Sequence, residues 1–222
     1  MAQPLPEALP PETRPVGQLI AETLRLYGRT FSQALPLGLT LAVADQVFRD
    51  LSFGAQVMAL LAFSPLFSLS YAGAVAVVTG ARPPKRRWVL AVVLGTVAFA
   101  PAAFLLPWFA LLAFAWLAVV GLVVPVAMIE EAGPRSAFVR AVRLARADYV
   151  HALGSLATLA ILFFLTRLML ALLLRGAGDQ TERIAVFLAD LVLAPIVFLG
   201  SALLYFDQAA RLESKSRDRK EP

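Results

Sequence analysis

The sequence predicts an all-α integral membrane protein with six transmembrane helices. Three observations lead to this fold class: 59% of the residues are apolar, only 16% are charged, and the mean hydropathy is +0.75. Soluble domains are about half apolar and about a quarter charged. A soluble core could not enclose so many long apolar runs, so lipid must cover much of the surface of this protein.

Six apolar segments account for the predicted spans, which are Phe31–Phe48, Val57–Thr79, two within Val89–Ile129, Ala152–Leu174 and Ile184–Phe206. The uncharged segment Val89–Ile129 would form one helix of about 60 Å, twice the roughly 30 Å thickness of the hydrocarbon core. Two spans joined by a tight turn near Pro107 and Trp108 fit this length instead. Pro65 lies inside the second span, where neighbouring helices can satisfy the carbonyl that it frees.

The chain is expected to divide into three parts. Residues 1–15 are predicted to be a disordered, proline-rich leader, residues 16–208 a single transmembrane domain, and residues 209–222 a charged cytoplasmic tail. The leader lacks the basic start and apolar stretch of a signal peptide. Cysteine is absent from the sequence, which excludes disulfides and Cys-ligated metals.

The distribution of Lys and Arg predicts that both termini lie in the cytoplasm. Sixteen of the 20 residues of these two types fall on the predicted inner side and three on the outer side, and cytoplasmic loops carry the excess of positive charge. The basic segments Arg82–Arg87 and Arg135–Arg146 flank Val89–Ile129. An even number of crossings must therefore separate them, in agreement with the length argument.

Two further segments, Val16–Thr30 and Pro134–Tyr149, are predicted to be amphipathic helices on the cytoplasmic face of the membrane. Their apolar stripes are Val16, Ile20, Leu24 and Tyr27 in the first and Phe138, Val142, Ala145 and Tyr149 in the second. The basic residues expected at the membrane surface are Arg25, Arg29, Arg140, Arg143 and Arg146. Each contributes about 1 kcal/mol of attraction to anionic lipid headgroups. Binding of a partner or of nucleic acid is an alternative, but topology alone explains these charges.

A parallel internal repeat is a further hypothesis. At an offset of 118 residues, Arg25-Leu26 matches Arg143-Leu144, and Thr40-Leu41-Ala42 matches Thr158-Leu159-Ala160. Both copies would place their amphipathic helix on the cytoplasmic side, which makes the repeat parallel rather than inverted. Chance similarity between two apolar stretches is the alternative.

The residue types that catalysis needs do not converge in this sequence. The HExxH, GxSxG, P-loop and GxGxxG patterns are absent. His151 is the only histidine, and we expect it to pack where the second amphipathic helix meets the fifth span. Glu130 and Glu131 are adjacent, so on a helix they point about 100° apart and do not pair as acid and base. We therefore expect no enzyme activity and no cofactor.

Three ionisable residues inside apolar segments form the candidate polar site. Arg167 lies about 12 Å from the outer end of the fifth span and Asp190 about 9 Å from the outer end of the sixth, so the two can pair. Asp45 lies about one turn below the outer end of the first span. An unpaired charge near mid-membrane costs roughly 3 kcal/mol. The functional reading is a polar pocket that binds a lipid headgroup or small anion through Arg167; the alternative is an ion pair that fixes helix register.

Three segments in succession resemble a group of bacterial multi-span proteins: LIAETLRLYGRTFSQALPLGL, VVPVAMIEEAGPRSAFVRAVRLARADYVHALG and LLYFDQAARLE. That group is related to the membrane domain fused to some glycerophosphodiester phosphodiesterases. The matching residues are Glu131, Gly133, Pro134, Ala137 and Arg140 in the second segment and, more loosely, Tyr205, Asp207 and Arg211 in the third. The resemblance covers Val16 to about Glu213 and implies six helices in a bacterial plasma (inner) membrane. It implies no catalysis, because the phosphodiesterase activity belongs to a separate TIM barrel of about 250 residues.

The function predicted from these observations is that of a non-enzymatic scaffold or accessory protein that organises partners or lipids. The alternative is a small transporter or lipid-handling protein that uses an outer-half pocket at Arg167, Asp190 and Asp45. The expected partners are the lipid bilayer and anionic lipid headgroups, with a membrane protein or a second copy of this chain as a further option. No metal and no nucleic acid are expected to bind.

Overall fold

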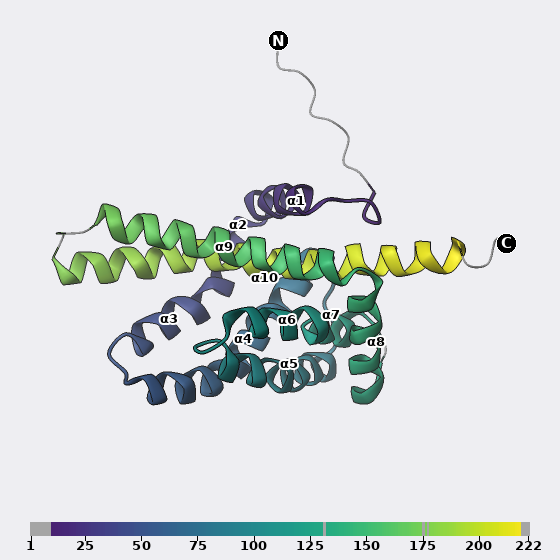
Figure 1. Cartoon of the computed structure of the whole chain (residues 1–222), viewed down its shortest axis with the longest axis horizontal. Helices are drawn as coiled ribbons and strands as arrows, with labels where there is room; N and C mark the ends of the chain where they lie inside the picture. Colours follow the sequence, from purple (N-terminus) through teal and green to yellow (C-terminus); the bar gives the residue numbers. More distant parts are fainter. Residues whose placement is uncertain (1–9, 131, 175, 177, 219–222) are drawn as a thin grey trace, which may run out of the picture.

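The computed structural model describes residues 10–218 apart from Glu131, Arg175 and Ala177. Every regular element in these residues is a helix, which confirms the all-α class. In chain order they are α1 (Val16–Arg29), α2 (Phe31–Ala34), the 3-10 helix η1 (Leu35–Gly38), α3 (Leu39–Phe48), α4 (Phe53–Thr79), α5 (Lys85–Leu105), α6 (Ala110–Val120), α7 (Val123–Ile129), α8 (Pro134–Ala147), α9 (Tyr149–Leu173) and α10 (Asp179–Asp218) (Figure 1).

Five helical stretches in the described residues are long and apolar enough to cross a membrane. They are α4, α5, α6 together with α7, α9 and α10. The turn predicted near Pro107 and Trp108 lies between α5 and α6, where the Trp108 N–H donates a hydrogen bond to the Leu105 carbonyl oxygen at 3.1 Å. The division of this long apolar segment into two antiparallel parts is therefore confirmed.

The first predicted span, Phe31–Phe48, is not a continuous helix. It is broken into α2, η1 and α3, and α3 has only 10 residues. Pro36 lies in η1 and has no N–H for the α-helical ladder. Gly38 lies directly against α10, because a Cβ added there would be 2.1 Å from the Leu191 carbonyl oxygen. The chain therefore tightens into a 3-10 turn where it packs against α10.

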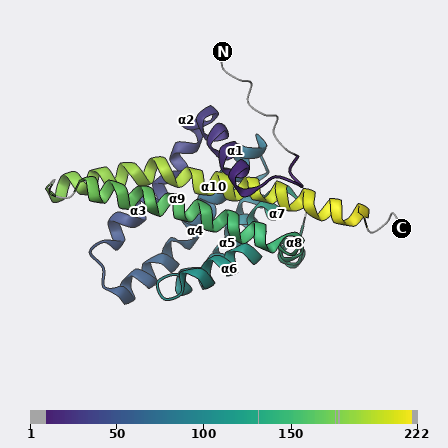
Figure 2. The same cartoon turned by 45° about the horizontal axis from the view of Figure 1, so that its top comes forward.

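Helix α1 packs against α10; it runs in the opposite direction to α10 in Figure 1, and Figure 2 shows that it is inclined to it. Arg14, two residues before α1, pairs with Asp207 of α10 at 2.9 Å, and Tyr27 near the end of α1 donates a hydrogen bond to the Val192 carbonyl at 2.7 Å. Asp207 and Val192 are about four helical turns apart. The position of α1 on the membrane surface stays a prediction.

The residues that α1 buries against the bundle are not, apart from Tyr27, those of its apolar stripe. Its buried residues are Leu19, Thr23 and Tyr27, whereas Leu24 of the predicted stripe is 45% exposed. The hydroxyl of Thr23 donates to the Leu19 carbonyl at 2.7 Å, so burial leaves it satisfied. Of the four residues of the apolar stripe, only Tyr27 is buried against the bundle.

Helix α8 has the same length as α1 but a different arrangement. Both contain 14 residues, and their first residues, Val16 and Pro134, are 118 positions apart. However, α8 is almost perpendicular to α10 in Figure 1, whereas α1 packs against α10 at a smaller inclination (Figures 1 and 2). Of the stripe predicted for α8, only Ala145 is among its buried residues. The internal repeat stays a hypothesis.

The last helix extends through the segment expected to be a solvated tail. Helix α10 continues to Asp218, and the Lys215 ammonium donates a hydrogen bond to the Ala147 carbonyl at the end of α8. At the other end of the chain, the side chain of Arg14 is only 12% exposed, although residues 1–15 were expected to be disordered. Residues 1–9 and 219–222 lie outside the described part.

Small residues let the long helices approach closely. A Cβ at Gly95 of α5 would lie 2.7 Å from the Ser68 hydroxyl of α4, and one at Gly200 of α10 would lie 2.7 Å from a methyl of Leu159 on α9. Close backbone approach at small residues is how membrane helices pack without a hydrophobic force between them. The resulting bundle holds the charged side chains described next.

Candidate functional site

The three ionisable residues predicted for the polar site meet between α3, α9 and α10. Arg167 Nη2 donates a hydrogen bond to Asp45 Oδ1 at 2.6 Å, and Arg167 Nε lies 3.1 Å from Asp190 Oδ1. The Asp190 side chain is fully buried, while those of Arg167 and Asp45 are 24% and 21% exposed. The structure brings all three together; whether they bind a ligand stays a prediction.

Further ion pairs extend this cluster toward the end of the bundle where α9 ends and α10 begins. Arg49, one turn after Asp45, lies 4.0 Å from its Oδ2 and 3.6 Å from the Glu182 carboxylate. Arg183 lies 3.4 Å from Asp50. Two cations, Arg49 and Arg167, therefore balance the carboxylates of Asp45 and Asp190. A bound anion would have to displace a carboxylate from Arg167, which favours the alternative of a structural ion pair over an anion site.

The cluster borders a cavity through Phe163. The guanidinium carbon of Arg167 lies 5.7 Å from the centroid of the Phe163 ring, a cation–π distance. Phe163 lies one turn before Arg167 on α9 and lines a cavity of about 300 Å³. Arg167 therefore joins the polar cluster to an apolar space in the bundle.

Six helices contribute to the walls of the cavity: α3, α4, α5, α6, α9 and α10. Its lining includes Leu60, Phe99, Ala113, Phe114, Ala160 and Phe163. Two polar side chains on its wall already donate hydrogen bonds to backbone carbonyls. The Ser64 hydroxyl donates to the Leu60 carbonyl at 3.1 Å, and the Tyr71 hydroxyl donates to the Ser201 carbonyl at 3.1 Å. The space thus offers contacts suited to an apolar occupant.

The cavity reaches the surface of the bundle. Phe164 and Leu106 line it and are nevertheless 56% and 36% exposed. Apolar residues on the same part of α9, including Ile161 and Leu165, are also exposed. In a membrane these side chains would face lipid, so a hydrocarbon chain could enter past Phe164 without crossing water.

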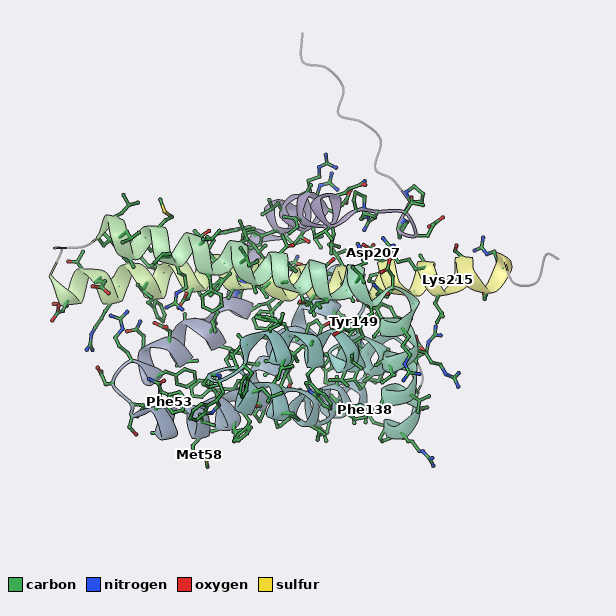
Figure 3. The ribbon with its side chains drawn as sticks, in the orientation of Figure 1. Phe53, Met58, Phe138, Tyr149, Asp207 and Lys215 are labelled. Carbon is green, nitrogen blue, oxygen red and sulfur yellow. The ribbon has the colours of Figure 1, made fainter. Side chains whose placement is uncertain are left out.

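A second charged cluster lies at the opposite end of the bundle, where the segment before α1, the start of α9 and α10 meet (Figure 3). The Asp207 side chain is fully buried, and its Oδ1 accepts a hydrogen bond from Arg14 Nη1 at 2.9 Å. His151 Nε2 lies 3.4 Å from the other oxygen of Asp207. Arg211 Nη1 donates to Asp148 Oδ2 at 2.7 Å. Ion pairs thus tie these three segments together.

Backbone hydrogen bonds reinforce this second cluster. Asp148 caps α9 by accepting a hydrogen bond from the His151 N–H at 3.0 Å. The Gln208 side chain bridges the backbone N–H and carbonyl of Asp148, at 3.2 and 3.0 Å, and Arg211 Nη2 donates to the Arg14 carbonyl at 2.7 Å. Sequence reasoning treated these residues separately. A signal was available in the segment 207–211, because Asp207 and Arg211 are four residues apart and share one helix face.

The basic residues predicted at the membrane surface have different surroundings. Arg140 is paired, because its Nε donates to Glu130, whose carboxylate also accepts from the Tyr205 hydroxyl at 2.9 Å. Arg25 lies 3.5 Å from Glu22 and its side chain is 44% exposed. The other three, Arg29, Arg143 and Arg146, are exposed. Glu131, which belongs to one of the quoted motifs, lies outside the described residues.

Neither a metal cluster nor a relative supplies a function. Within residues 10–218, outside the three gaps, no group of three His, Cys, Asp or Glu side chains is arranged to hold a metal. Comparison of the chain with protein-family models, with curated proteins and with solved structures finds no match. The resemblance to the phosphodiesterase-linked membrane domain therefore stays a prediction, and functional inference rests on the cavity and the charged clusters.

Proposed function

We propose that this protein is a non-enzymatic, lipid-handling membrane protein that accommodates a hydrocarbon chain in the cavity between α4, α5, α6, α9 and α10. The observation that carries the proposal is the apolar lining of a cavity that opens past Phe164 and Leu106. Its volume of about 300 Å³ is at the lower end of the range for small-molecule sites, roughly 300–1,000 Å³.

Dispersion contacts explain why a lipid chain would occupy this cavity. A chain that leaves the bilayer for an apolar cavity gains no hydrophobic free energy, because both surroundings are apolar. An empty cavity, however, loses the dispersion contacts of all the atoms that line it. A chain that enters past Phe164 restores those contacts, so shape rather than polarity would decide which chain fits.

In this proposal the cluster of Arg167, Asp45 and Asp190 positions the cavity wall. It joins α3, α9 and α10 beside Phe163, and its cations are balanced by carboxylates. The proposal therefore keeps the lipid role expected from the sequence but assigns it to the cavity instead of to the charged residues. The role as a scaffold for protein partners stays a prediction.

Filling the cavity should remove bound lipid. Ala160 lines the cavity, and Ala160→Phe would place a ring inside it. The matched control is Ala171→Phe, at an exposed position on the same helix. In native mass spectrometry of protein released from membranes in mild detergent, we expect wild type and Ala171→Phe to retain a lipid adduct and Ala160→Phe to lose it. An equal adduct on all three proteins would contradict the proposal.

We also propose six crossings in a bacterial plasma membrane, with both termini in the cytoplasm. Support for the count comes from α1, η1 and α3, which together follow the length of α10: Arg14 pairs with Asp207, and Arg49 lies 3.6 Å from Glu182. These three elements would make the broken first crossing. Support for the orientation comes from the excess of Lys and Arg at the end that contains Arg14.

Because the natural sequence has no cysteine, single cysteines report this orientation directly. Asp50 lies before the start of α4 and Lys85 lies after its end, at the start of α5. Both residues are exposed. We expect Asp50→Cys to react with a membrane-impermeant maleimide in intact spheroplasts, and Lys85→Cys to react only after permeabilisation. Labelling of Lys85→Cys in intact spheroplasts would reverse the orientation.

A further inference from the structure

A groove between α1, α4 and α10 carries two arginines beside apolar helices. It has a volume of about 290 Å³ and is lined by Glu22, Arg25, Leu26, Arg29, Val78 and Leu203. Leu203 lies one turn before Asp207 on α10, and Val78 lies at the end of α4 that leads into the basic segment Arg82–Arg87. In the proposed orientation, the groove is in the inner half of the membrane.

The packing of α1 places two charged side chains beside apolar residues, and a group bound in the groove would lower the cost of that placement. Arg25 and Arg29 line the groove beside apolar residues of the bundle, Leu26, Val78 and Leu203. A charged side chain that faces hydrocarbon costs about 2.5–3.5 kcal/mol on insertion scales. Long arginine side chains reduce this cost by reaching toward the membrane surface. A polar or charged group in the groove would reduce it further.

The charge of the groove favours an anion. Arg25 and Arg29 are four residues apart on α1, so they occupy one helix face, where like charges repel each other. Glu22 offsets only one of them, and only through a contact of 3.5 Å between partly exposed side chains. An anion between the two guanidinium groups would remove the repulsion and accept charge-assisted hydrogen bonds, for which arginine is well suited.

The remaining walls favour a lipid as the source of that anion. Leu26, Val78 and Leu203 are apolar and only half-buried, so they can contact the glycerol region and the first part of an acyl chain. We propose that this groove binds the phosphate of an anionic phospholipid from the inner leaflet, with Arg25 and Arg29 as its ligands. This site is separate from the proposed chain cavity, and neither depends on the other.

Lipid-dependent thermal stability of the purified full chain tests this proposal. Phosphatidylglycerol added to the detergent-solubilised wild type should raise the Tm, while phosphatidylcholine and inorganic phosphate should not. In Arg25→Gln/Arg29→Gln the apparent affinity for phosphatidylglycerol should fall about tenfold or more, because charge-assisted hydrogen bonds are lost. The matched control, Arg183→Gln/Arg217→Gln, removes the same charge from two exposed arginines that do not line the groove and should keep the response of the wild type.

A variant that keeps both arginines tests the proposal even if the double variant misfolds. Val78→Phe narrows the groove and should also weaken the response to phosphatidylglycerol. Equal responses in wild type and Arg25→Gln/Arg29→Gln would overturn the proposal. A rise in Tm with inorganic phosphate as large as that with phosphatidylglycerol would also overturn it, because the ligand would then be a free anion. The Ala160→Phe variant should keep the rise in Tm with phosphatidylglycerol even when it has lost its lipid adduct, so the two proposals fail independently.

Discussion

Arg167→Met is expected to lower the free energy of unfolding by about 3–5 kcal/mol, because it leaves a buried carboxylate without its cation. Asp190 is fully buried, and its nearest cationic atom is Arg167 Nε at 3.1 Å. Asp45, in contrast, keeps Arg49 at 4.0 Å. The stability loss therefore comes mainly from Asp190, whose carboxylate remains among apolar helices.

The double variant Arg167→Met/Asp190→Leu distinguishes ion pairing from loss of packing. Replacing both members of a buried ion pair with apolar side chains of similar size is often nearly neutral, so most of the stability should return. Arg183→Met is the control, because Arg183 and Asp50 are 49% and 69% exposed and such pairs contribute less than about 1 kcal/mol. Thermal unfolding in detergent, followed by circular dichroism, measures all three. A stable Arg167→Met protein would show that Asp190 needs no cation.

Gly38→Ala is expected to have the second largest effect. A Cβ at this position would lie 2.1 Å from the Leu191 carbonyl oxygen and 2.9 Å from the Leu191 Cα, so η1 and α10 would have to separate. Overpacking of this kind costs about 1–3 kcal/mol and sometimes more. The loss would appear despite the better helix propensity of alanine.

Gly28→Ala provides the matched control for Gly38→Ala. Gly28 lies in α1, and a Cβ there would meet nothing within 4 Å. This variant should be neutral or stabilised by up to about 1 kcal/mol, since glycine inside a helix is unfavourable relative to alanine. Equal thermal stabilities of the two variants would contradict the close contact between η1 and α10.

The sequence was sufficient to predict most helix positions, because apolar length and charged flanks are local properties. The second predicted span, Val57–Thr79, ends where α4 ends, and the turn near Trp108 lies between α5 and α6. The meeting of Arg167 with Asp190 followed from their similar depths in consecutive antiparallel helices. The break of the first predicted span, Phe31–Phe48, into α2, η1 and α3 was not predicted from the sequence. Pro36 was visible, but the contact of Gly38 with Leu191 joins residues far apart in the sequence.

The difference between the apolar stripe of α1 and the face that it packs against the bundle has a physical cause. Hydrophobic periodicity finds the core of a soluble protein because water surrounds the other face. Around a membrane bundle the solvent is itself apolar, so Leu24 can be exposed while Thr23 is buried and hydrogen-bonded to its own helix. The stripe of apolar residues in α1 therefore did not indicate its packing face.

The cavity and the second charged cluster depend on which residues face one another across the bundle. Ala113 and Ala160 are small residues of the kind that pack helices closely, and only the three-dimensional arrangement shows that they border an open space. Likewise, Arg14 belongs to a segment that was expected to be disordered, and Asp207 lies just before the segment that was expected to be a solvated tail. Their pairing required α1 to lie along α10.

The most direct test of the proposed lipid chain in the bundle is a cryo-electron microscopy map of the protein in lipid nanodiscs. We predict elongated density in the cavity, running past Phe164 toward Phe99, and no such density in Ala160→Phe. A map in which α6 and α9 close so that Phe114 packs against Phe163, with no space between them, would contradict the account.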